Sequence, residues 1–63
     1  QILADLVARR RQIVEMMGAE RQRLRRITLP RVCLSIERLI RALEKELADL
    51  DQDIDDAVRG SLA

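Results

Sequence analysis

The sequence is short of the residues that usually stabilise a small domain. Among its 63 residues there is no phenylalanine, tyrosine, tryptophan or histidine, and Cys33 is the single cysteine. One cysteine excludes an intrachain disulfide, and a chain without histidine lacks the usual ligand set of a structural zinc site. Domains of this size bury a low fraction of their surface and often need a partner to fold. We therefore expect a core of Leu, Ile, Val, Met and Ala that another chain completes.

The residues that are present indicate an all-α protein. The chain is 48% hydrophobic and 37% charged, and it is rich in alanine, leucine, glutamate and arginine. This composition is typical of long helices and coiled coils. No apolar stretch approaches the roughly 18 to 20 residues of a membrane span, and no signal-peptide pattern is present, so we expect a cytoplasmic protein without a membrane partner. Because the chain begins with Gln1, we expect it to be part of a longer protein.

Two stripes of aliphatic residues predict two helices, over residues 2–27 and residues 30–59. In both stripes the apolar positions alternate at spacings of three and four, which places them on one helix face. The second stripe is unbroken, whereas Arg10 and Glu20 interrupt the first. We expect the seam of the coiled coil and of a dimer to consist of Leu3, Leu6, Ile13, Met17, Leu24, Ile36, Ile40, Leu43, Leu47, Leu50 and Ile54.

The only proline, Pro30, marks a turn over residues 28–30. Proline disfavours helical geometry in the residue before it and fits the first turn of a new helix. We expect Thr28 to be an N-cap or turn residue, and Gly60 with Ser61 to end the second helix. A connection this short favours an antiparallel two-helix hairpin. One continuous helix through the proline is the competing geometry.

The distribution of charge supports the hairpin. The first 27 residues hold seven arginines and three acids, net +4, whereas the rest of the chain holds five basic and eight acidic residues, net −3. Folding back at the turn brings the arginine run that starts at Arg9 alongside the acidic end of the second helix. A polar residue in a coiled-coil seam usually fixes the pairing of the helices, so we expect Arg10, near Glu44 or Glu46, to do so here.

The apolar stripe is wider than one partner helix can cover. Val7, Val14, Val32 and Leu39 flank the seam. In a two-helix hairpin each seam residue is covered from one side only. We therefore expect a homodimer that forms an antiparallel four-helix bundle, or a longer intermolecular coiled coil, with oligomerisation as the primary activity. The sequence leaves dimer and tetramer both open.

Five arginines surround the proline, and they suggest a contact with phosphates. The helix dipole favours cations at the end of the first helix, but not at the start of the second. The tip is therefore either a nucleic-acid contact or a plain solvated end. Without aromatic residues to stack on bases, such a contact would be made to the phosphate backbone and would not read sequence. The candidate residues are Arg21, Arg23, Arg25, Arg26 and Arg31.

We expect no catalytic residue, metal ligand or cofactor in this segment. The acids of "DLDQDIDD" point in different directions on a helix and lack the glycine and final glutamate of an EF-hand loop. Cys33 lies on the seam and is expected to behave as a small hydrophobe. Ser35 and Ser61 have no neighbouring base in the pattern, so neither is expected to be a nucleophile.

Three stretches resemble a known family of transposases. "LVARRRQIVEM", "AERQRL" and "SIERLIRALEKELADLDQDIDDAV" are similar to the central segment of the DEDD-type, RuvC-like insertion-sequence transposases of the IS-one-ten family, over roughly residues 3–60. The chain departs from the family pattern at Leu39 and Ala42, where histidine and tryptophan are common.

The resemblance implies a coiled-coil dimerisation region of a bacterial transposase, joining a RuvC-like domain to a C-terminal domain with a catalytic serine. It implies that the whole protein recombines DNA with a structured guide RNA, that its nuclease-like domain uses Mg²⁺, and that its catalytic residues lie outside this segment. Two alternatives remain open: a stand-alone helical oligomerisation module, and a helical hairpin that contacts nucleic-acid phosphates.

Overall fold

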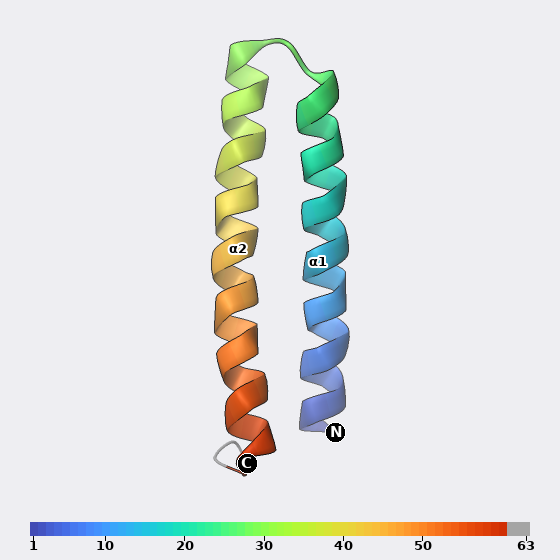
Figure 1. The fold of residues 1–63 in the computed structure, drawn as a ribbon, viewed down its shortest axis with the longest axis vertical. Coiled ribbons are helices and arrows are strands. Elements are labelled where there is room, and N and C mark those ends of the chain that lie inside the picture. The colour runs from blue at the N-terminus through green and yellow to red at the C-terminus, as the bar shows by residue number, and fades with distance from the viewer. Residues whose placement is uncertain (61–63) are drawn as a thin grey trace.

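The chain forms an antiparallel hairpin of two helices, shown in Figure 1 as a computed structural model that describes residues 1–60. α1 spans Ile2–Arg26 and α2 spans Pro30–Val58. They lie side by side as a rod of 47 × 15 × 11 Å, with Gln1 and Gly60 at the end opposite the turn. The predicted all-α hairpin is confirmed, and one continuous helix through Pro30 is excluded.

Three residues between the helices make the turn. Ile27 leaves helical geometry at φ −95° and ψ 135°, while its N–H still donates to the carbonyl of Arg23 at 3.2 Å. Leu29 is also extended, at φ −71° and ψ 119°. The ring of Pro30 imposes this conformation, because it clashes with a helical residue directly before it. α2 therefore begins at Pro30, whose missing N–H is not needed in the first turn.

Of the two roles expected for Thr28, N-cap or turn residue, the structure shows the second. Leu29 occupies the N-cap position, and no side chain caps the helix. Thr28 is therefore a turn residue, since the extended residue forced by the proline is the one directly before it. α1 ends one residue earlier than expected, at Arg26.

Gly60 lies just beyond the end of α2, where a stop was expected. Its φ of 80° is the left-handed conformation that glycine adopts without steric cost. Its N–H donates to the carbonyl of Ala57 at 3.1 Å, which satisfies one of the last carbonyls of the helix. The helix itself ends at Val58, and Ser61 lies outside the described residues.

The core is one line of aliphatic side chains between the two helices. Ile13, only 1% exposed, and Met17 from α1 form a cluster with Leu43 and Leu50 from α2. None of the residues expected in the seam is exposed. Buried are Ile13, Met17, Ile36, Leu43 and Leu50, and half-buried are Leu3, Leu6, Leu24, Ile40, Leu47 and Ile54.

Truncating the centre of this line should destabilise the hairpin strongly. Replacing Ile13 by alanine removes a fully packed side chain, so we expect the free energy of unfolding to fall by about 2 to 4 kcal/mol. The matched control is Met16→Ala, because Met16 is 44% exposed on the same helix; it should cost less than about 1 kcal/mol. Urea denaturation followed by circular dichroism measures both. Equal losses in the two variants would contradict this assignment of the core.

Candidate assembly surface

The hairpin exposes more surface to water than a compact protein of its mass. Its accessible surface is 4912 Å², whereas a compact monomer of 7.3 kDa would expose about 4200 Å². The exposed large aliphatic side chains lie on both helices and around the turn. They are Ile2, Val7, Val14, Met16, Leu29, Val32, Leu34, Leu39 and Val58.

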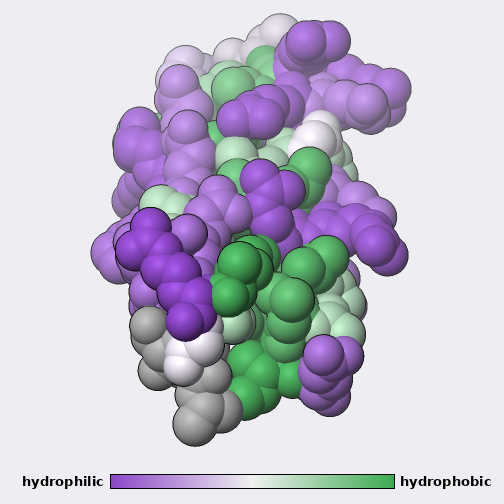
Figure 2. All heavy atoms as spheres, turned by 60° about the horizontal axis from the view of Figure 1, so that its bottom comes forward, coloured by the Kyte–Doolittle hydropathy of each residue, from purple (hydrophilic) through white to green (hydrophobic). Residues whose placement is uncertain are grey.

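Part of this surface lies at the open end of the rod, away from the turn. Figure 2 brings that end forward and shows hydrophobic side chains gathered between the helices and reaching the surface, with hydrophilic side chains around them. Ile2 and Val7 on α1 and Val58 on α2 are among the exposed residues there, and Val58 is 68% exposed. The four residues expected to flank the seam, Val7, Val14, Val32 and Leu39, are all exposed as well. The seam is thus closed on neither flank.

A groove of about 390 Å³ runs between the helices on one of these flanks. Its apolar lining comes from Val14 and Met17 on α1 and from Leu47 and Ala48 on α2. Charged side chains border it: Arg21 on α1, and Glu44 and Asp51 on α2. We call this surface the α1–α2 groove. Apolar lining with a charged border is the usual composition of a protein–protein contact.

Arg10 joins the two helices, but through a different partner from the expected one. Its Nε donates to Oδ1 of Asp51 at 2.6 Å, so the expectation of Glu44 or Glu46 is wrong. Helical side chains lean toward the N-terminus of their own helix. For α1 that direction leads away from the turn, so the guanidinium reaches an acid nearer the open end. Within residues 1–60 this is the only ion pair between the helices.

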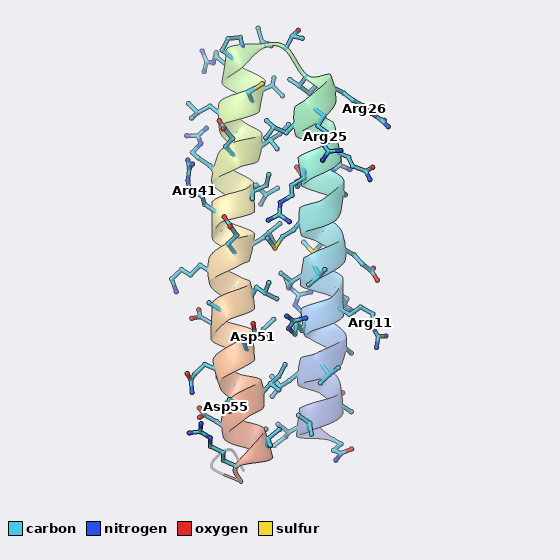
Figure 3. All side chains as sticks on the ribbon, in the orientation of Figure 1. Arg11, Arg25, Arg26, Arg41, Asp51 and Asp55 are labelled. Carbon is cyan, nitrogen blue, oxygen red and sulfur yellow. The ribbon has the colours of Figure 1, made fainter. Side chains whose placement is uncertain are left out.

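The arginines near the turn have different surroundings. Arg23 pairs with Glu20 on its own helix, and Arg21 borders the α1–α2 groove. Figure 3 shows Arg26 pointing away from α2. The charges of these arginines therefore do not all point the same way.

The tip nevertheless keeps unneutralised positive charge. Within the described residues, no ion pair involves Arg25, Arg26 or Arg31, and all three are exposed. The first turn of α2 contains no acid, so nothing there offsets the positive end of its dipole. A contact with a polyanion remains a prediction for this end.

The acidic end of α2 has local structural partners. Asp51 accepts from Arg10, Asp55 pairs with Arg59, and Oδ1 of Asp56 accepts from Gln52 at 3.0 Å. Within residues 1–60, no group of three histidine, cysteine, aspartate or glutamate side chains is placed to hold a metal ion. These acids serve the helix and its pairing.

The two remaining candidate nucleophiles within residues 1–60, Cys33 and Ser35, both lie near the start of α2. Cys33 is half-buried at the turn, and its thiol donates to the carbonyl of Ile27 at 3.4 Å. Ser35 is exposed on α2. Neither side chain is placed as an activated nucleophile. Within residues 1–60, no basic side chain forms a hydrogen bond with the Cys33 thiol or the Ser35 hydroxyl.

No family model, curated protein or solved structure matches this chain. Within residues 1–60, neither helix is long and apolar enough to cross a membrane.

Replacing Arg10 by leucine should stabilise the hairpin. Arg10 and Asp51 are 43% and 51% exposed, and pairs this accessible contribute less than about 1 kcal/mol. Leucine would instead continue the aliphatic stripe, so we expect the free energy of unfolding to rise by about 1 kcal/mol in urea denaturation. Arg9→Leu is the control, since Arg9 is exposed and bonds only to Gln12 on its own helix. A loss of stability in the Arg10 variant alone would show that the ion pair contributes more than packing.

Proposed function

We propose that this chain is the coiled-coil dimerisation segment of a DNA transposase of the RuvC-like, IS-one-ten type. The observation that carries the assembly role is the aliphatic surface on both flanks of the seam. Within residues 1–60 the hairpin has no second layer to cover this surface. The family assignment is supported by the three sequence stretches described above.

In this proposal the hairpin positions catalytic domains and performs no chemistry. It joins a RuvC-like domain to a domain that carries a serine nucleophile, in a bacterial cytoplasmic protein. DNA and a guide RNA reach the assembly through those domains, and Mg²⁺ belongs to the nuclease-like one. The chain's own contribution is to pair with a second copy.

The runner-up is a stand-alone helical oligomerisation module. The two proposals differ in what surrounds the segment in its gene. The transposase proposal requires a RuvC-like nuclease pattern upstream and a serine-containing recombinase region downstream. If neither pattern is found, the transposase proposal is wrong, and the stand-alone oligomerisation module becomes the proposed function.

Analytical ultracentrifugation of the 63-residue chain tests assembly directly. At micromolar concentration we expect a particle of twice the 7.3 kDa chain mass or more. Leu43→Asp should abolish both association and helicity, because it buries an unpaired carboxylate in the core. Gln22→Asp introduces the same charge at an exposed position of α1 and should leave both intact. A folded wild-type monomer would refute the assembly role.

A second function, phosphate contact by the tip, is favoured by the unpaired Arg25, Arg26 and Arg31. If it occurs, binding of RNA or DNA should weaken as salt rises. The double variant Arg25→Glu and Arg26→Glu should reduce the slope of log affinity against log salt by about 2. Arg9→Glu with Arg11→Glu reverses the same amount of charge away from the tip and serves as control. Absence of binding at low salt, or equal loss in both variants, would remove this function.

A further inference from the structure

Two of the three charged side chains that border the α1–α2 groove have no charged partner within the hairpin of residues 1–60, whereas the third, Asp51, pairs with Arg10. Arg21 and Glu44 lie on opposite sides of the same groove, one on each helix. Yet within residues 1–60 neither side chain takes part in an ion pair or a side-chain hydrogen bond. The groove therefore presents a cation, an anion and an apolar floor to whatever covers it.

We propose that a second copy of this chain covers the α1–α2 groove, with the two rods parallel and both tips at the same end. This inference rests on the proposed dimerisation. It adds which surface of the hairpin the second copy contacts, and whether the two rods are parallel or antiparallel. In a two-fold assembly about an axis along the rods, α1 of one copy faces α2 of the other. Arg21 and Glu44 line the same stretch of the groove. In parallel rods, Arg21 of each copy therefore lies opposite Glu44 of the other copy.

The apolar residues extend the same match toward the open end. Val7 lies one heptad before Val14, and Val58 lies one heptad after Asp51. Positions seven residues apart share a face of a coiled coil. Val7 and Val58 therefore continue the two sides of the groove, and both are exposed. Parallel rods place each of them opposite the other in the partner copy.

The opposite direction fits less well. With antiparallel rods, α1 would face α1 and α2 would face α2. The acids Glu44 and Asp51 would then approach the same acids of the partner, and like charges across an interface are strongly unfavourable. Parallel rods do bring the two tips together. However, Arg26 points away from α2 in Figure 3, and salt screens exposed charges beyond about 8 to 10 Å.

The available surface is sufficient for a stable contact. A standard interface takes about 800 Å² from each partner, which is about one sixth of the 4912 Å² that the hairpin exposes. The groove and its two valines run along the 47 Å length of the rod, so one long side can supply this area.

Mixing two charge-reversed chains tests the proposal. Arg21→Glu alone places like charges across the interface, and so does Glu44→Arg alone, because each occurs twice in a two-fold dimer. We expect the dissociation constant of each single variant to rise at least about tenfold. In an equimolar mixture, a heterodimer pairs one chain of each variant. Both contacts between the two chains, from position 21 of one to position 44 of the other, then join opposite charges. Within each single chain the charges at positions 21 and 44 still have the same sign. Association of the mixture should therefore return to within about threefold of wild type.

Sedimentation of the single variants and of their mixture gives the readout, and circular dichroism checks that each chain is helical. Both positions are exposed, so the hairpin should tolerate the changes. A control pair, Glu15→Arg and Arg38→Glu, reverses charges at exposed positions opposite the seam of α1 and of α2, and should neither weaken nor restore association. A wild-type dimer whose single variants associate normally, or whose mixture gains nothing, would overturn the proposed surface. A wild-type monomer would overturn the proposed function as well.

A distance measurement tests the direction independently. Spin labels on Thr28→Cys, with Cys33→Ser to remove the native thiol, report the separation of the two tips. Parallel rods should give about 20 Å, roughly two helix diameters. Antiparallel rods would give a separation close to the 47 Å rod length, which would overturn the parallel arrangement while leaving dimerisation itself intact.

Discussion

Two helices can cover a buried side chain from only one direction each, and this constraint governs the molecule. Ile13, in the middle of the seam, is fully buried, whereas Leu3 and Ile54 near the open end are half-buried. The flanking valines stay in water. A larger domain would add a third element over them. In the proposed dimer a second chain covers them, which would link the stability of the fold to its state of association.

Electrostatic contacts supply the specificity that aliphatic packing lacks. A stripe of leucine and isoleucine repeats every heptad, so a slipped pairing would still bury apolar surface. Arg10 and Asp51 oppose such slippage, because a shift of one heptad separates them and leaves a cation in the seam. In the proposed dimer, Arg21 and Glu44 have the same role between chains. Charged pairs thus fix the register of the helices, which aliphatic packing alone leaves open.

The helices, their turn and the seam could be predicted from the sequence because periodicity and proline geometry act locally. The partner of Arg10 could not, since spacing assigns a side chain to a face but says nothing of its lean along the helix. The directions of the arginines near the turn could not be predicted from their order alone, because neighbours in sequence point to different sides of a helix. That Arg26 points away from α2 is known only from the structure (Figure 3).

The hairpin returns to its own starting point, so Gln1 and Gly60 lie at the same end of the rod (Figure 1). Polypeptide attached at either position would therefore be held together whatever the length of the rod. One extra heptad in each helix would move the turn outward by about 10 Å and leave the base unchanged. The length of the hairpin can therefore change in evolution without moving the end at which Gln1 and Gly60 lie.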